Sequence, residues 1–539
     1  MGRTEAFMEF DYIIVGAGTA GSVLAARLTE DPNTSVLVLE AGKADRSILI
    51  HVPLGFGRIN QKRYFDWGYN SEPEPNLGGR VVALPRGKVL GGTSSINGMV
   101  FVRGHREDFD RWARNGATGW SYEDVLPYFR KLENWAGERA ECRGADGPLD
   151  VRENAYQDPL NAAFAEALPA YGLPRNPDYN RGDMRGFAPL QQTLRGGRRA
   201  SAAVAYLKPS LKRPNLKLES GALVERLTIE EGRATGLIYR RGGNLHTVRA
   251  RREVILAGGA YNSPQLLMLN GIGPAVELAA HGIAPLLDLP AVGRNLQDHP
   301  VVLLEYDRLD EGPFMRASRW DRAILNGLAA YLAGKGSATN VPSSGLGFVH
   351  LDPESPVPEV QYLFRPISRL ARPWFPLIAA QGPNRFGCSI ILLHPQSRGS
   401  VTLKSPDPAA SVRIVPNFLG SENDRRLLRG AIRLGRRILA DKAFEKSRGA
   451  EILPGDSAVT DEALDRYLEQ YVSTAHHPVG TCRMGSDADS VVDASLRVRG
   501  VDRLRVVDAS VMPDLTSGNT NAPTLMIAEK AADMIRSGK

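Results

Sequence analysis

Short apolar runs separated by glycine turns mark the beginning of the chain. Asp11–Val15 and Val36–Leu39 are apolar runs, and residues 21–29 between them have the alanine and leucine content of a helix. A strand, a glycine turn, a helix and a second strand within about thirty residues form the βαβ unit that begins a doubly wound parallel sheet. Val254–Ala257 is predicted as a further buried strand of this sheet.

The pattern changes between residues 310 and 465. Val360–Phe364 and Ser389–Leu393 have the apolar content of strands, and residues 423–441 have helical spacing with many arginines. We interpret the arginines of this helix as a solvated face. The glycine-punctuated pattern returns after residue 470, so the middle stretch is predicted to be a second domain facing the first, which the C-terminal residues complete.

The composition is that of a globular protein long enough for two or more domains. The chain has 539 residues, of which 42% are hydrophobic and 24% charged, and these values exclude disordered and collagen-like chains. At this length a single core would outgrow the usual domain size. The net charge of +7 is dispersed among acidic residues, which argues against a nucleic-acid partner.

Cysteine content and hydropathy predict the compartment. Cys142, Cys388 and Cys482 lie far apart and form no C-x-x-C pair, which favours a reducing, cytoplasmic location. The most apolar early stretch, residues 12–28, contains glycines and Arg27, and no uncharged run of about eighteen apolar residues occurs. We expect no signal peptide, no membrane span and no metal site, while a peripheral membrane contact stays open.

A glycine motif follows the first predicted strand. Gly16, Gly18 and Gly21 form a G-x-G-x-x-G that opens the predicted helix, and Glu40 ends the next strand. The first glycine permits the tight turn, the second lets the backbone approach a pyrophosphate, and the third lets the helix pack on the strand. Glu40 can accept a hydrogen bond from a ribose hydroxyl and would repel a 2′-phosphate. The motif predicts a dinucleotide but does not separate FAD from NAD.

Two further motifs carry a resemblance to a known family. Residues 87–97 and residues 259–273 resemble the two signatures of the glucose-methanol-choline family of FAD-dependent oxidoreductases. The second signature departs at Asn270, where the family usually has Ser or Cys. Within the family, the motif spacing is most similar to that of bacterial choline-dehydrogenase-like and alcohol dehydrogenases.

The resemblance implies an α/β and α+β fold. A FAD-binding, doubly wound Rossmann-like domain would be interleaved with a substrate domain built on a mostly antiparallel sheet. The FAD-binding domain is expected to contain residues 1–160, 200–310 and 470–539. The substrate domain is expected to contain residues 161–199 and 311–469.

The resemblance also implies how FAD is held. Ile96 occupies the position where some members carry a His bound covalently to the flavin, so non-covalent FAD is implied. The Gly91-Gly92 turn would let the backbone lie against the flavin ring, since a side chain there would collide with it. The implied FAD contacts, which include the glycine motif and its ribose-binding acid, are Gly16, Gly18, Thr19, Ala20, Gly21, Glu40, Ala41, Val89, Gly91, Gly92, Asn97, Gly98, Met99, Val100, Val224, Asp508, Ala509, Pro523 and Thr524.

Two adjacent histidines are candidates for the base that alcohol oxidation requires. Of the nine histidines, only His476 and His477 lie in a polar-to-glycine turn, and the ordinary pKa of histidine suits a base near neutral pH. Adjacent residues in an extended chain point in opposite directions, so only one is expected to face the flavin, and chemistry alone does not say which. The catalytic His of the family immediately precedes a Pro-x-Gly-Thr element. The resemblance therefore implies His477 as the base and His476 as a packed or hydrogen-bonded neighbour.

An amide side chain is the second catalytic candidate. Family members carry His or Asn at the position of Asn519, and an amide there can hydrogen-bond the substrate oxygen without titrating. Asn521 is predicted as the N-cap, and Pro523 as part of the first turn, of a C-terminal helix whose positive end would face the flavin. Residues 297–299 resemble a family segment that we interpret as structural, and a position close to the cofactor stays open for it.

The motifs together imply FAD-dependent oxidation of an alcohol to the aldehyde, with electrons passed to a quinone, a dye or oxygen. Choline dehydrogenase is an alternative, but residues 340–348 lack the Glu that choline-type relatives often carry, and a quaternary ammonium needs an anionic or aromatic cage. An uncharged primary alcohol is therefore the preferred substrate. A redox-inactive, FAD-containing lyase stays a second alternative, because a few relatives cleave cyanohydrins.

Overall fold

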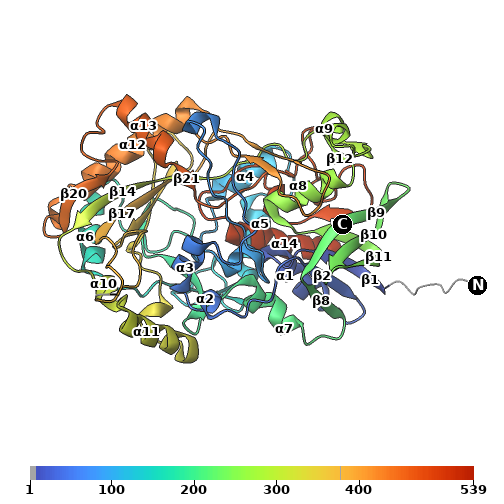
Figure 1. Cartoon of the computed structure of the whole chain (residues 1–539), viewed down its shortest axis with the longest axis horizontal. Coiled ribbons are helices and arrows are strands. Elements are labelled where there is room, and N and C mark those ends of the chain that lie inside the picture. The colour runs from blue at the N-terminus through green and yellow to red at the C-terminus, as the bar shows by residue number, and fades with distance from the viewer. Residues whose placement is uncertain (1–7, 377, 539) are drawn as a thin grey trace, which may run out of the picture.

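Two large sheets form the framework of the protein (Figure 1). The computed structural model describes residues 8–376 and 378–538. One sheet lies at each end of the long axis of the molecule, and the chain passes between them several times. The predicted combination of a doubly wound sheet with a mostly antiparallel sheet is confirmed.

The first sheet is built from three separate parts of the chain. In spatial order its strands are β8 (Leu216–Ser220), β2 (Val36–Glu40), β1 (Met8–Val15), β11 (Asn244–Leu256), β10 (Arg233–Arg241) and β9 (Ala222–Glu230), with β22 (Leu504–Val506) paired to β11. Strands β8, β2, β1, β11 and β22 pair in parallel, whereas β9, β10 and β11 form an antiparallel meander. The apolar runs that predicted β1, β2 and the end of β11 are buried, because a parallel sheet is covered on both faces.

Helices α1 (Thr19–Leu28), α14 (Asn521–Arg536) and α5 (Tyr122–Leu132) pack in a row beside this sheet. A buried carboxylate, that of Glu529, fixes α1 to α14. Its oxygens accept hydrogen bonds from Arg27 Nε at 2.8 Å and from the Tyr206 hydroxyl at 2.8 Å. Because a buried charge is costly without a partner, this ion pair fixes how α1 and α14 pack against each other.

The second sheet is antiparallel throughout. In spatial order its strands are β20 (Arg448–Leu453), β14 (Pro300–Arg308), β17 (Arg385–Leu392), β16 (Val360–Arg365), β15 (Gly345–Val349) and β5 (Gly186–Ala188), with β21 (Ser473–Thr474) paired to β14. Helix α12 (Glu422–Leu439) packs on β17, and α13 (Asp461–Tyr471) packs on α12. The strands and the helix predicted for the middle of the chain are therefore present.

The arginines of α12 do not form one solvated face, and that expectation is wrong for two of them. Arg429 is buried and its guanidinium lies 2.8 Å from the carboxylate of Asp465 on α13. Arg436 lies 2.7 Å from the carboxylate of Glu451 on β20. Helical spacing alone cannot reveal these partners, because they come from other elements.

The chain crosses between the two sheets at two places that lie side by side. Strand β14 begins directly after His299, and β21 ends shortly before His476. Pro300 pairs with Thr474, and the backbone N–H of Ala475 donates to the carbonyl of His299 at 2.9 Å. Since β14 and β21 belong to the second sheet, the domain boundaries predicted at residues 310 and 470 are displaced from the crossings.

The remaining α-helices and several short strands lie outside the two large sheets. None of the described helices is long and apolar enough to cross a membrane. The other elements are α2 (Ile48–His51), α3 (Gly55–Lys62), α4 (Arg106–Arg114), α6 (Pro159–Ala167), α7 (Lys208–Ser210), α8 (Gly259–Leu269), α9 (Ala275–Ala280), α10 (Pro313–Ala317), α11 (Trp320–Ala333), β12 (Ile272–Gly273), β13 (Leu287–Asp288), β18 (Ser400–Thr402) and β19 (Arg413–Val415).

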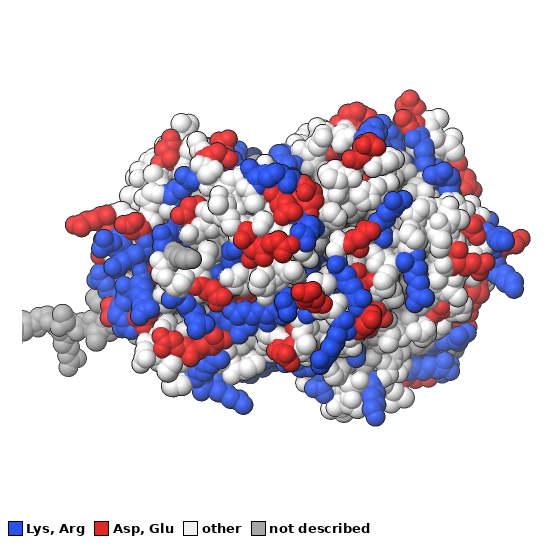
Figure 2. Space-filling view, turned by 180° about the vertical axis from the view of Figure 1, so that it is seen from behind, with Lys and Arg blue, Asp and Glu red and all other residues white. Residues whose placement is uncertain are grey.

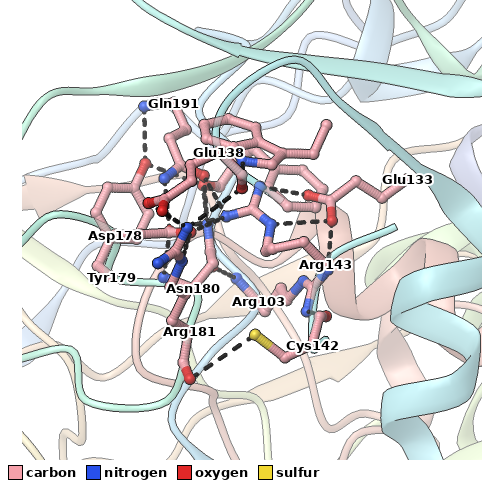
Figure 3. Close-up of polar contacts among 12 residues, drawn as sticks. Arg103, Glu133, Glu138, Cys142, Arg143, Asp178, Tyr179, Asn180, Arg181 and Gln191 are labelled. Carbon is pink, nitrogen blue, oxygen red and sulfur yellow. Dashed lines mark hydrogen bonds and ion pairs between the residues drawn. The ribbon is translucent and has the colours of Figure 1, made fainter. Parts of the chain in front are cut away.

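A small third sheet contains β3 (Glu133–Trp135), β4 (Leu149–Glu153), β6 (Gln191–Arg195) and β7 (Arg198–Arg199). A buried ion-pair network beside it is shown in Figure 3. The carboxylate of Glu133 accepts from both Arg103 and Arg143, and Arg143 also lies 2.8 Å from Asp178. Gln191, at the start of β6, donates to Asp178 at 2.7 Å. The network therefore fixes β6 in place.

Strand β6 in turn pairs with the segment that is predicted to lie against the flavin. The backbone N–H of Phe101 donates to the carbonyl of Gln191 at 2.9 Å, and the N–H of Thr193 donates to the carbonyl of Met99 at 2.9 Å. Val100 pairs with Gln192. The buried ion-pair network therefore fixes β6, and β6 fixes residues 99–101 through backbone hydrogen bonds.

Replacing Glu133 by Ala is expected to destabilise the fold strongly. The change leaves two buried guanidinium groups without their shared carboxylate, and breaking a buried ion pair in this way costs about 3–5 kcal/mol. Thermal unfolding followed by circular dichroism measures the loss. Glu138→Ala is the matched control, because the Arg181–Glu138 pair is exposed and exposed pairs contribute little. Equal melting temperatures for the two variants would contradict the role of the network.

Candidate active site

A cavity of about 1530 Å³ lies between the two sheets. It is larger than the roughly 300–1000 Å³ typical of a small-molecule pocket, so it has room for a dinucleotide together with a substrate. Its wall is formed by the glycine loop after β1, by residues 96–100, by α3 and the loops beside it, by strands of the second sheet, by residues 473–478 after the second crossing and by residues 519–521 at the start of α14.

The glycine loop after β1 has the backbone geometry that its sequence predicts. Gly16 has a φ of 102°, and a Cβ there would lie 2.5 Å from the carbonyl oxygen of Ala257. A Cβ at Gly21 would lie 1.9 Å from the carbonyl oxygen of Gly16. Gly18 lies on the cavity wall. Gly16 and Gly21 are thus required by packing, and Gly18 leaves the backbone at the start of α1 open to a phosphate.

Glu40 is buried at the end of β2 and lies on the cavity wall. Its two carboxylate oxygens accept hydrogen bonds from the backbone N–H groups of Ala17 at 2.9 Å and Gly42 at 2.7 Å. Burial raises the pKa of Glu40 to about 7, against the lowering effect of these two hydrogen bonds. Besides facing the expected ribose, the carboxylate ties the glycine loop to the end of β2.

The second glycine turn packs directly on the first. The N–H of Gly91 donates to the carbonyl of Ala17 at 2.8 Å, and a Cβ at Gly92 would lie 2.8 Å from the Cα of Gly18. Beyond this turn, the side-chain oxygen of Asn97 accepts from Arg199 Nη1 at 2.8 Å. The turn and the segment after it therefore form one continuous wall with the glycine loop.

Most of the predicted cofactor residues face the cavity. Four do not form part of its wall: Gly21, Val89, Gly91 and Pro523 lie behind it. The predicted residues on the wall are Gly16, Gly18, Thr19, Ala20, Glu40, Ala41, Gly92, Asn97, Gly98, Met99, Val100, Val224, Asp508, Ala509 and Thr524, together with His477 and Asn519.

Asp508 links the second family signature, residues 259–273, to the C-terminal segment. One of its carboxylate oxygens accepts from the Gly259 N–H at 2.9 Å and from the Ser263 hydroxyl at 2.6 Å, and the other accepts from the Ser510 N–H at 2.8 Å. Asn521 is not the N-cap that the sequence predicts, because α14 begins at Asn521 itself. Its side-chain oxygen instead accepts from the Thr19 hydroxyl at 3.0 Å. The N-termini of α1 and α14 are thereby joined at the cavity.

His477 is held on three sides. Its backbone N–H donates to Asp298 Oδ1 at 2.8 Å, its Nδ1 lies 2.9 Å from His299 Nδ1, and its Nε2 lies 3.0 Å from Asn519 Nδ2. The Thr474 hydroxyl donates to the other oxygen of Asp298 at 2.6 Å. Two predicted catalytic side chains are thus in contact, although they come from separate segments.

The histidines of this group are held in the neutral form. Burial, followed by the neighbouring His299, His476 and Arg86, lowers the pKa of His477 well below its usual value. Burial lowers the pKa of His299 to about 3. Since a buried imidazolium is costly to form, both rings carry a single proton near neutral pH, and one of them donates it across the Nδ1–Nδ1 contact.

Both of the adjacent histidines line the cavity, although only one of them is expected to face the flavin. His476 has a φ of 68°, in the left-handed region, so the alternation of an extended chain does not apply. Its N–H donates to the Thr474 hydroxyl at 2.6 Å, and its carbonyl accepts from Arg86 Nη2 at 2.7 Å. The Nδ1 of His476 is buried and has no hydrogen-bond partner among residues 8–376 and 378–538.

Asp298 and His299 are site residues that sequence reasoning interpreted as structural. The side chain of His299 reaches His477, and Asp298 holds the His477 backbone. The available signal was the resemblance of residues 297–299 to a family segment, but the contact depends on the pairing of β14 with β21. No local pattern reports that pairing.

Comparison with known protein families shows which family of enzymes this chain belongs to. A family model described as GMC oxidoreductase matches residues 10–301, and a second model with the same description matches residues 395–528. The chain belongs to the GMC oxidoreductase family. It is an FAD-dependent oxidoreductase that acts on CH–OH groups.

Named relatives of this GMC oxidoreductase span nearly its whole length. It is 43% identical over 531 residues to an oxygen-dependent choline dehydrogenase of Brucella anthropi, and 44% identical over 534 residues to one of Rhizobium etli, each match covering 98% of this chain and 96% of the relative. Pyridoxine 4-oxidase from Mesorbium loti is similar in structure, with a TM-score of 0.87, 33% identity and coverage of 98% and 99% of the two chains. A variant of Aspergillus oryzae formate oxidase has a TM-score of 0.90 at 28% identity, with 98% of each chain covered.

Acid denaturation of the purified GMC oxidoreductase is expected to release all of its FAD into solution. Ile96 lies on the cavity wall at the position of the linking histidine, and its side chain has no nucleophilic atom. The flavin absorbance of the supernatant and of the precipitate measures the partition. Flavin that remains with the precipitated chain would contradict non-covalent binding.

Proposed function

We propose that this GMC oxidoreductase oxidises an alcohol to the aldehyde, with His477 as the base that accepts the hydroxyl proton. The observation that supports this most directly is the contact between His477 Nε2 and Asn519 Nδ2 at 3.0 Å on the wall of the cavity. A substrate hydroxyl beside these two atoms would reach a base and a hydrogen-bond donor together. Asn97–Val100, on the same cavity wall, would line the flavin.

The cofactor supplies the acceptor for the hydride of the carbinol carbon. His477 removes the proton from the substrate oxygen at Nε2. Asn519 donates a hydrogen bond to that oxygen, and because an amide does not titrate, it can do so for the alcohol and for the alkoxide. The backbone of residues 97–100 and Gly92 shapes the wall on the cofactor side, so that the carbinol carbon is held between the base and the flavin.

His299 fixes which nitrogen of His477 is free. The single proton of the neutral His299 ring lies on Nδ1 or on Nε2, and Nε2 has no hydrogen-bond partner among residues 8–376 and 378–538. With that proton on Nε2, His299 Nδ1 accepts from His477 Nδ1–H across the 2.9 Å contact. The Nε2 of His477 is then unprotonated. It accepts from Asn519 Nδ2 at 3.0 Å, and a substrate hydroxyl would take the place of this hydrogen bond. We therefore assign His299 as a positioning residue for the base.

Choline is the alternative substrate that the named relatives suggest. Against it, Glu40 and Asp508 are the acidic side chains on the described cavity wall, and both lie at the expected cofactor end, where backbone amides bind them. Ser343 and Pro342 line the wall in the segment where choline-type relatives often carry Glu. A quaternary ammonium would lack a counter-charge, so we propose an alcohol without a positive charge. Oxygen, a quinone or a dye would re-oxidise the flavin.

The lyase alternative predicts no redox chemistry. A cyanohydrin-cleaving enzyme would hold FAD without reducing it, whereas an alcohol oxidoreductase bleaches the flavin absorbance when substrate is added under nitrogen. The intact pair of His477 and Asn519 supports the redox function. Anaerobic addition of a panel of primary alcohols, followed by oxygen or by a dye in separate samples, tests it.

The His477→Ala variant is expected to keep FAD and to lose roughly two to four orders of magnitude in the rate of flavin reduction, because the base is removed. His476→Ala is the matched control: it lies next in the chain and also lines the cavity, but its ring has no contact with Asn519. We expect a much smaller loss. Stopped-flow absorbance of the two variants measures both rates, and a greater loss in His476→Ala would overturn the assignment.

The rate of flavin reduction is expected to stay constant from alkaline pH down to pH values below 6.5. Burial lowers the pKa of His477, so the neutral base persists to lower pH than free histidine would allow. The rate falls only when the His477 ring becomes protonated. The Asn519→Ala variant is expected to reduce the flavin more slowly at every pH, with the midpoint of the fall at the same pH. An acid limb with its midpoint above pH 6.5, measured by stopped flow, would show that burial does not control the base.

A further inference from the structure

The charges on the cavity wall are arranged very unevenly. On the outer surface drawn in Figure 2, Lys and Arg side chains are interspersed with Asp and Glu. On the described cavity wall, by contrast, Glu40 and Asp508 are the acidic side chains, and both belong to the cofactor end. The part of the wall near His476, α3 and the segment after β16 carries arginines instead: Arg58, Arg63, Arg86, Arg365, Arg369 and Arg372.

Two of these arginines are neutralised by acids outside the cavity. Arg63 Nε lies 2.7 Å from Asp66, and Arg365 Nη2 lies 3.3 Å from Glu305. Their positive charges are therefore balanced before any ligand binds. They contribute shape to the wall, but little net charge.

Arg86 and Arg369 have no carboxylate partner among residues 8–376 and 378–538. Arg86 donates only to backbone carbonyls, from Nε to Pro85 at 2.5 Å and from Nη2 to His476 at 2.7 Å. Arg369 has neither a hydrogen bond nor an ion pair within that part of the chain. Arg369 thus presents a whole guanidinium, with its planar set of N–H donors, to the cavity.

Arg369 is exposed, and other positively charged side chains share its part of the cavity wall. Burial and then the charges of Arg86, Arg369 and Arg63 lower the pKa of His476 to about 3. A bound anion would relieve this repulsion, and a bound cation would increase it.

Apolar side chains form another part of the cavity wall. The wall near His477 and Asn519 is lined by Val100, Leu190, Val301, Leu363 and Ile391. A ligand that fills this region needs an apolar body, with one polar end at the base and a charged end at the guanidinium groups.

We propose that the substrate is an alcohol that carries a carboxylate at the end remote from its hydroxyl group, and that Arg369 and Arg86 bind this carboxylate. The planar guanidinium of Arg369 matches a carboxylate in a two-point hydrogen-bonded arrangement. The inference rests on the proposed alcohol oxidation and replaces the expectation of an uncharged alcohol with a more specific substrate class.

The test compares ω-hydroxy carboxylic acids of increasing chain length with their methyl esters, which keep the hydroxyl and the chain but lack the charge. We expect the kcat/KM of flavin reduction to be higher for the acid than for the ester by about tenfold or more at the best chain length, as one charge-assisted hydrogen bond would give. In Arg369→Gln this preference is expected to fall to less than about threefold, through loss of activity on the acid alone.

Arg322→Gln is the matched control, because Arg322 is exposed on α11 and is not part of the cavity wall. It removes the same charge near the cavity and should keep the preference for the acid. The flavin spectrum and melting temperature of both variants establish that they fold. An ester reduced as fast as its acid by the unchanged enzyme would overturn the inference and leave the proposed alcohol oxidation standing.

A binding measurement separates the two proposals. Calorimetric titration of the oxidised holoenzyme with the matching unsubstituted carboxylate needs no turnover, and Arg369→Gln should weaken this binding by about tenfold or more. If the carboxylate binds in this way but no alcohol in the series bleaches the flavin, the alcohol oxidation is wrong and the anion site is supported. Equal binding to both proteins would overturn the anion site.

Discussion

The buried carboxylate of Asp298 is the interaction on which the candidate active site depends. It accepts the backbone N–H of His477 and the hydroxyl of Thr474, and so joins the chain entering the second sheet to the chain leaving it. Burial raises the pKa of Asp298 to about 6, against the lowering effect of these hydrogen bonds and of Arg86. Because a buried carboxylate needs its donors, the two crossings are held together, and His299 and His477 meet as a result.

This arrangement explains which parts of the site could be predicted from the sequence. The glycine loop and Glu40 were predictable from residue types at fixed spacings. A tight turn and a close approach of the backbone to a pyrophosphate require glycines, and a ribose hydroxyl favours an acid. The contact between His299 and His477 was not, because it arises from the pairing of β14 with β21, two strands far apart in the chain. His477 itself was found through the resemblance and not through its periodicity.

The failed expectations have a common physical cause. The direction of His476 depends on a left-handed backbone, which hydrogen bonds from Arg86 and to Thr474 stabilise, and such strain persists only where tertiary contacts hold it. The burial of Arg429 on α12 likewise depends on Asp465 from another helix. Local patterns predicted some strands of both sheets and the helices α1, α12 and α14, whereas the partners of buried polar groups come from segments that only the complete fold brings together.

Burial acts in opposite ways at the two ends of the cavity. Near the base it keeps His477 neutral, which is the form that accepts a proton, so the cost of burying an imidazolium serves the chemistry. At the cofactor end the cost of burying a charge is offset, because backbone amides donate hydrogen bonds to Glu40 and Asp508. Arg369 is exposed, and no group in the described chain balances its charge. A cavity wall that leaves one guanidinium unpaired, while the acids on the wall are hydrogen-bonded, is complementary to a ligand of the opposite charge.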